Sequence, residues 1–181
     1  MSNWKGTLEQ VVQTRRGSLV GYAYLFTGDR AAAEDLVHDA IIRTFTRARD
    51  LGNIHAAEGY VKRVIATQFI NSTRSAKVLR DKSHLIATPE GTPGHAGAVA
   101  DSVSVEAAIM TLTPRERACI VLRFYEDQTV PEMARSLGIA EGTIKRYLHT
   151  AIGRLHEVLG DTPGLRLTPD DNRVAVTPRS K

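Results

Sequence analysis

The stretch "LGIAEGTIKRYLHTAIGRL", Leu137 to Leu155, decides how the C-terminal half of this chain is interpreted. Its apolar residues recur at intervals of three and four, which predicts a helix with one face turned toward a core. The opposite face begins with small, basic and hydrogen-bonding side chains: Thr143, Lys145, Arg146, His149 and Thr150. These residues by themselves do not explain why a helix should carry such groups at its front.

The sequence before this stretch supplies the context. "TPRE" at 113–116 and "TVPE" at 129–132 both have the spacing of a capping box, with proline near the first helical position. The second of them opens a short helix that Gly138 is expected to end. A short helix, a glycine turn and a longer helix with a polar leading edge are typical of a helix-turn-helix. In that motif the front of the second helix contacts base edges in the major groove, so a DNA-reading role explains the polar front.

Whole-chain properties agree with such a role without demanding it. The chain has 181 residues, and its 24 basic and 20 acidic residues give a net charge of +4, which permits a nucleic-acid partner. Cys119 is the only cysteine, which excludes a disulfide framework or a cysteine-based zinc site within the chain. The N-terminus lacks the apolar run of a signal peptide, and no stretch approaches eighteen apolar residues. We expect a cytoplasmic protein. We also expect Cys119, which lies on an apolar helix face, to be a core residue.

Charge and composition divide the chain into four parts. Residues 1–87 hold 13 basic and 8 acidic residues, whereas residues 105–160 hold 7 of each. Between them, residues 88–104 are rich in proline, glycine and alanine and have no periodic pattern, which predicts a flexible linker between two domains. Residues 161–181 contain three prolines and no apolar period, so we expect a disordered tail.

The first domain has only helical patterns, so the predicted fold class is all-α. One apolar stripe runs from Leu8 through Val11 and Val12 to Phe26. Asp29 is the expected N-cap of a second helix, with Glu34 and Asp35 in or near its first turn, ending near residues 51–52. A third helix is expected from about residue 57 to residue 74.

Together these segments resemble a known family. Residues 112–159, "LTPRERACIVLRFYEDQTVPEMARSLGIAEGTIKRYLHTAIGRLHEVL", closely resemble region four of the bacterial extracytoplasmic-function sigma factors. Residues 28–45, "GDRAAAEDLVHDAIIRTF", resemble region two of the same proteins, and residues 60–74 resemble the helix that follows it. The resemblance implies an RNA polymerase specificity subunit with no catalytic activity and no cofactor or bound metal. Its partners would be promoter DNA and core polymerase, contacted at the clamp helices of the largest subunit and at the flap of the second.

The resemblance also assigns site residues by position. Duplex reading of the minus-thirty-five element falls on Gly142, Thr143, Lys145, Arg146, His149 and Thr150. Contacts to the melted minus-ten strand fall on Lys62, Arg63, Thr67, Gln68, Asn71 and Arg74, with a base pocket near Asn53 and His55. Basic and amide side chains suit these tasks, since they hold phosphates and an unstacked base. The polymerase-docking surface falls on Asp35, His38, Asp39 and Arg43. Arg115, Arg117 and Arg154 are expected to be ordinary surface charges, or else phosphate anchors.

Two other functions fit parts of the sequence. The first is an autonomous helix-turn-helix regulator that binds DNA without polymerase, although residues 1–87 lack the alternating strands of a receiver domain. The second is a protein-interaction module that serves as a decoy for an anti-sigma factor. The family resemblance also allows an anti-sigma factor as a partner of a working sigma factor. An enzyme is the least expected class, because no glycine-rich phosphate loop, nucleophile elbow or paired-carboxylate signature occurs.

Overall fold

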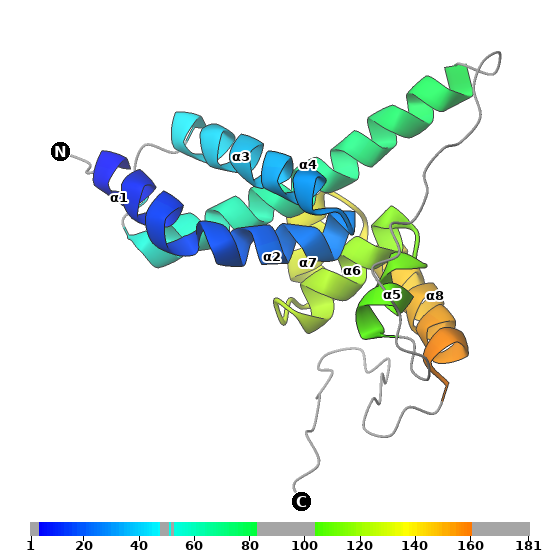
Figure 1. Ribbon diagram of the computed structural model, residues 1–181. Coiled ribbons are helices and arrows are strands. Elements are labelled where there is room, and N and C mark those ends of the chain that lie inside the picture. Colours follow the sequence, from blue (N-terminus) through cyan, green and yellow to red (C-terminus); the bar gives the residue numbers. More distant parts are fainter. Residues whose placement is uncertain (1–3, 48–50, 52, 83–103, 161–181) are drawn as a thin grey trace, which may run out of the picture. The chain divides into compact units, whose positions relative to one another are not determined.

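The computed structural model describes residues 4–47, 51, 53–82 and 104–160, with side chains described as far as residue 72 in the long helix of the first unit. Every element in these ranges is helical, which confirms the all-α prediction. The chain divides into two compact units, Met1–Asp101 and Ser102–Lys181 (Figure 1). The predicted linker and tail lie outside the described residues, apart from Ser104. None of the described helices is long and apolar enough to cross a lipid bilayer.

The first unit consists of consecutive helices. They are α1 (Trp4–Gln10), a π-helical turn η1 (Val11–Arg15), α2 (Arg16–Thr27), α3 (Arg30–Arg47) and α4 (Ile54–Lys82). The predicted apolar stripe continues past the π-helical turn, because Leu19, Tyr22 and Phe26 of α2 are buried. Val11 is fully buried while Val12 is 42% exposed, because neighbouring residues point to different sides of a helix, so the prediction that both valines face the core was wrong for Val12.

Local hydrogen bonds set where α3 and α4 begin. Asp29 Oδ1 accepts from the Ala32 N–H at 2.8 Å, which confirms Asp29 as the N-cap of α3. The first turn of α3 contains no acidic residue, because Glu34 lies further along the helix and pairs with Arg30 at 3.1 Å. Asn53 Oδ1 accepts from the Ala56 N–H at 2.9 Å and caps α4.

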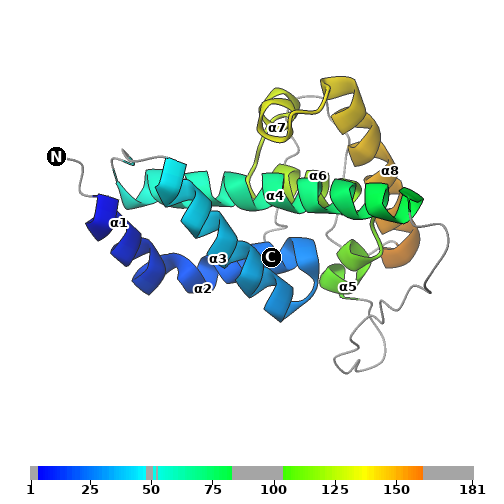
Figure 2. The same cartoon turned by 90° about the horizontal axis from the view of Figure 1, so that it is seen from above.

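The helix α4 is longer at both ends than predicted. It spans Ile54–Lys82, whereas the periodic residues indicated about 57–74. The early start follows from the Asn53 cap, which the apolar pattern does not contain. In Figures 1 and 2 the C-terminal part of α4 extends past the ends of α2 and α3.

Aromatic packing joins α2 to α4 in the core of the first unit. The rings of Tyr22 and Phe26 meet edge to face with centroids 5.0 Å apart, and Phe26 lies 5.5 Å from Phe69 of α4. Such pairs add to the free energy gained by burying the rings. This cluster fixes the buried face of α4 and leaves its other face to the surface.

The second unit contains α5 (Val105–Met110), α6 (Pro114–Phe124), α7 (Val130–Leu137) and α8 (Glu141–Leu159). Both predicted capping boxes are confirmed. Thr113 and Glu116 exchange side-chain and backbone hydrogen bonds at the start of α6, as do Thr129 and Glu132 at the start of α7. These reciprocal bonds satisfy N–H groups that have no partner within their own helix.

Gly138 makes the turn between α7 and α8. Its φ of 64° and ψ of 36° place it in the left-handed region, and its N–H donates to the carbonyl of Ala134. Glycine adopts this conformation without the steric cost that a Cβ brings. Figure 2 shows α7 and α8 joined by a short turn, the arrangement of a helix-turn-helix.

Cys119 lies in the core of the second unit, as predicted. The residue has no exposed surface, and desolvation raises the pKa of its thiol to about 12, with a smaller contribution from the charge of Glu116. A buried thiol with such a pKa is a small apolar core group rather than a nucleophile.

Candidate nucleic-acid interface

The first half of α8 presents the predicted minus-thirty-five residues outward. Gly142, Lys145, Arg146, His149 and Thr150 are exposed, and Thr143 is half-buried. The opposite face is buried through Ile144, Leu148, Ala151, Ile152 and Leu155. The six predicted residues therefore share one helix whose back is fixed in the core, and a basic, hydrogen-bonding surface is left at the front.

Tyr147 belongs to this surface and was not predicted. Arg115 of α6 donates from Nη1 to the Tyr147 hydroxyl at 3.1 Å, and the guanidinium of Arg146 lies 5.7 Å from the centroid of the same ring. Tyr147 follows Thr143 by one helical turn, a spacing that places it beside the predicted residues. That spacing was the available signal, but no sequence pattern indicates its contact with Arg115.

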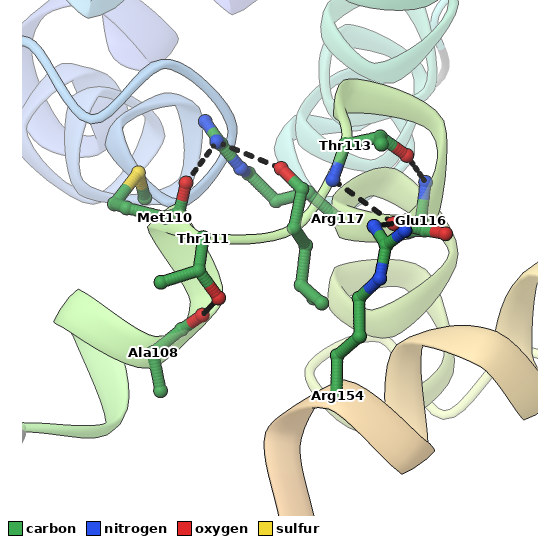
Figure 3. A network of polar contacts seen from close by, with 8 residues as sticks. Ala108, Met110, Thr111, Thr113, Glu116, Arg117 and Arg154 are labelled. Carbon is green, nitrogen blue, oxygen red and sulfur yellow. Dashed lines mark hydrogen bonds and ion pairs between the residues drawn. The ribbon is translucent and has the colours of Figure 1, made fainter. Parts of the chain in front are cut away.

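An ion pair ties α8 to the start of α6. Arg154 Nη1 lies 2.7 Å from Glu116 Oε2, and the Glu116 side chain is only 6% exposed (Figure 3). The same carboxylate oxygen accepts the N–H of Thr113 at 3.0 Å. A charge that is nearly buried in this way is retained only with hydrogen-bonding partners. Glu116 thus caps α6 and contacts the C-terminal half of α8.

Arg117 is half-buried and bonded within its own unit, so it is not an ordinary surface charge. Its Nη2 donates to the carbonyl oxygens of Met110 at 2.8 Å and Leu112 at 3.2 Å, so it satisfies the C-terminal end of α5 and the connection to α6 (Figure 3). Burial lowers the pKa of its guanidinium. Of these three arginines, Arg117 and Arg154 hold helices together, and Arg115 contacts α8 through Tyr147.

The predicted minus-ten residues lie on α4 or directly before it, and only some of them share one exposed stripe. Arg63, Thr67 and Asn71 recur every four residues, so they form one stripe. Arg63 and Asn71 are exposed, while the Thr67 hydroxyl donates to the Arg63 carbonyl at 2.8 Å. The side chain of Arg74, which would continue the stripe, lies outside the described residues.

Other predicted minus-ten residues stand apart from this stripe. Lys62 lies with its Nζ 5.4 Å from the centroid of the Tyr22 ring, so its ammonium is drawn toward α2. Gln68 is half-buried, and its Oε1 is buried without a hydrogen-bond partner. Asn53 and His55 are exposed at the start of α4, about two turns before Arg63.

The predicted polymerase-docking residues form one exposed face of α3. Asp35, His38, Asp39 and Arg43 are exposed, and their spacing of three and four places them together. Ile42, which was not predicted, lies among them and is 51% exposed. It also lines a hollow of about 600 Å³ between α1 and α3, together with Trp4, Leu8, Ile41, Phe45 and Thr46. Ile42 therefore joins the charged face of α3 to an apolar hollow beside it.

Comparison with known proteins agrees with both units. Residues 11–78 match the sigma-70 region 2 family, and residues 108–157 match sigma-70 region 4. The chain is 32% identical over 142 residues to the ECF RNA polymerase sigma factor SigL of Mycobacterium tuberculosis, covering 76% of this chain and 80% of SigL. It is 29% identical over 154 residues to the RNA polymerase sigma-E factor of Streptomyces avermitilis, covering 83% and 84%.

A solved structure shares the fold. The Bartonella quintana sigma factor RpoE, crystallised with the anti-sigma factor NepR, aligns with a TM-score of 0.58 at 20% identity over 85% of this chain and 97% of the other. This structural similarity supports the fold, whereas the sequence relatives support the family. This chain belongs to the extracytoplasmic-function sigma factors of the sigma-70 family, which direct promoter-specific transcription initiation by RNA polymerase and are not enzymes.

Proposed function

We propose that this sigma factor divides its task among three surfaces. The front of α8 reads the minus-thirty-five element as duplex, the exposed stripe of α4 holds the melted minus-ten strand, and the charged face of α3 docks on core polymerase. Residues 1–87 would form the region-two domain, residues 105–160 the region-four domain, and residues 88–104 the linker between them. The strongest support is the front of α8, where exposed basic side chains stand on a helix whose other face is fully packed.

Lys145 and Arg146 are the main residues proposed to read the minus-thirty-five duplex. Both can donate to guanine edges or phosphates, and only the arginine has the forked geometry for a bidentate contact. His149 and Thr150 lie one turn further along the exposed face and would contact bases or thymine methyl groups. Gly142 has no Cβ and stands in open space, so the backbone can approach DNA closely there.

Strand separation at minus ten is assigned to α4. Arg63 would hold a phosphate, and the amide of Asn71 would hydrogen-bond an unstacked base on the same stripe. Gln68 adds no support, because its amide oxygen is buried and has no hydrogen-bond partner among the described residues. Asn53 caps α4 with its side chain, so His55 is the better candidate for the base pocket.

Docking on core polymerase is assigned to the face of Asp35, His38, Asp39 and Arg43, with Ile42 at its centre. Complementary charge would fix the register on the clamp helices, and the apolar side chain would supply binding energy. The second unit would bind the flap of the other large subunit. An anti-sigma factor would be a further partner, because a protein that shares the fold was crystallised with one.

Transcription in vitro tests this assignment. Core polymerase is mixed with genomic DNA, with or without the chain, and the 5′ ends of the transcripts are sequenced. We expect new start sites that share an upstream element, and their loss with Lys145→Ala/Arg146→Ala. An autonomous regulator would instead shift a promoter fragment without core polymerase. A decoy for an anti-sigma factor would give no new start sites, and its activity would be indifferent to the double substitution.

A further inference from the structure

Tyr147 stands between two arginines that belong to different helices. Its hydroxyl accepts a hydrogen bond from Arg115 of α6 at 3.1 Å, and its ring lies beneath the guanidinium of Arg146 at 5.7 Å from centroid to Cζ. Arg115 and Tyr147 are 32 positions apart in the sequence, so this contact exists only in the folded unit. The ring is half-buried, whereas Arg146 is exposed.

Each contact leaves its arginine able to bind a further group. A guanidinium carries five N–H donors in one plane, and the Tyr147 hydroxyl takes one of those of Arg115. The guanidinium of Arg146 lies near the ring of its neighbour Tyr147, and the Arg146 side chain is exposed, so its N–H donors remain accessible to a ligand. Long arginine side chains lose considerable rotamer freedom when they bind, and a side chain that is already held loses less. Tyr147 therefore restricts the conformations of the Arg115 and Arg146 side chains in the unbound protein.

The position of each arginine indicates what it contacts. Arg146 lies at the front of the helix that enters the major groove, where side chains reach base edges. Arg115 projects from α6 beside this helix, where a cationic side chain meets the sugar-phosphate backbone. We propose that Tyr147 is a positioning residue in the minus-thirty-five complex. It directs Arg115 to a backbone phosphate and Arg146 to a purine edge. This inference rests on the proposed reading of duplex DNA by α8.

Two substitutions separate the two contacts. Tyr147→Phe removes only the hydroxyl that holds Arg115, and Tyr147→Leu removes the ring beneath Arg146 as well. Tyr125→Phe is the matched control, because Tyr125 is another tyrosine of the same unit and is 54% exposed. The chains are assembled with core polymerase, and the probe is a labelled promoter fragment at which the wild-type holoenzyme initiates.

We expect graded losses of promoter affinity. Tyr147→Phe should weaken binding by about threefold to tenfold, since one charge-assisted hydrogen bond is lost. Tyr147→Leu should weaken it by more than about tenfold and should lower discrimination at the base pair read by Arg146, which Tyr147→Phe retains. Tyr125→Phe should bind as wild type. Because Tyr147 acts through Arg115, Arg115→Gln and Arg115→Gln/Tyr147→Phe should bind equally.

A purely structural role would give a different pattern. Base discrimination would then be unchanged in Tyr147→Leu. Additive losses from Arg115→Gln and Tyr147→Phe would show that the two side chains act independently, and either result overturns the proposal. Wild-type holoenzyme that cannot distinguish the promoter from a fragment with an altered upstream element would refute duplex reading by α8, and the role of Tyr147 with it. Clear wild-type discrimination with additive losses would refute the role of Tyr147 alone.

Discussion

Arg154 and Glu116 lie 38 positions apart in the sequence, yet their side chains meet at 2.7 Å in the second unit. The carboxylate of Glu116 serves two elements at once, because it also closes the capping box of α6 through the Thr113 N–H. The ion pair therefore links the start of α6 to α8, the helix proposed to read DNA.

The two partners of this pair should differ in their effect on stability. Glu116→Ala removes a cap and an ion pair and should cost about 2–3 kcal/mol. Arg154→Ala should cost about 1–2 kcal/mol, because the arginine side chain is 45% exposed and its carboxylate partner retains the Thr113 N–H. Hydrogen exchange of the α6 amides measures the free energy of opening in this unit. A larger loss with Arg154→Ala than with Glu116→Ala would contradict this account.

The glycines of the second unit should respond in opposite directions to alanine. Gly138→Ala should destabilise by about 1–2 kcal/mol, because its φ of 64° is unfavourable for a residue with a Cβ. Gly153→Ala, within α8, should stabilise by about 0.5–1 kcal/mol through helix propensity. A Cβ meets no heavy atom within 4 Å at either position, so only the backbone conformation differs. Urea denaturation followed by circular dichroism checks both, and equal effects would argue against the left-handed turn.

The exposed isoleucine of α3 should matter for polymerase affinity. Ile42→Ser should weaken binding to core polymerase by about tenfold, since an apolar anchor within a charged face is lost. Val12→Ser is the matched control, because Val12 is 42% exposed in the same unit but lies outside the α3 face. Fluorescence anisotropy of labelled chain titrated with core enzyme gives both dissociation constants. Equal weakening by the two substitutions would place the docking surface elsewhere.

Acid should weaken the second unit through Glu132. The backbone N–H and the hydroxyl of Thr129 donate to this carboxylate, which lowers its pKa below the ordinary value of 4.5. The folded form therefore binds a proton less readily than the unfolded form, so stability rises with pH in this window. The contribution is complete above about pH 5 and is lost as the pH falls through the lowered pKa.

Glutamine at this position provides the comparison. Glu132→Gln keeps the capping geometry but does not titrate, so its melting temperature should fall less than that of the wild type between about pH 5 and about pH 3. Glu157→Gln, which neutralises an exposed carboxylate near the end of α8, should keep the wild-type slope. The same slope in all three proteins would show that the cap does not depress this pKa.

The sequence alone determined the helical class, both capping boxes, the Asp29 cap, the turn at Gly138 and the burial of Cys119. Each of these depends on residues within about four positions of one another, the range over which a helix repeats and caps form. The exposure of the residues proposed to read DNA could also be predicted from the sequence, because their spacing on α8 places them opposite the apolar stripe. The full length of α4 was missed, since its Asn53 cap and its C-terminal end lie outside the apolar period.

Only the tertiary structure decided which charged side chains are occupied by other parts of the chain. Arg117 and Arg154 hold helices together, Lys62 turns toward Tyr22, and Arg115 meets Tyr147. An arginine at an exposed helical position has the same local pattern whether it binds a phosphate, a carbonyl or a carboxylate. The choice among these partners depends on which helix faces pack together, and that packing is set by buried contacts between residues far apart in the chain.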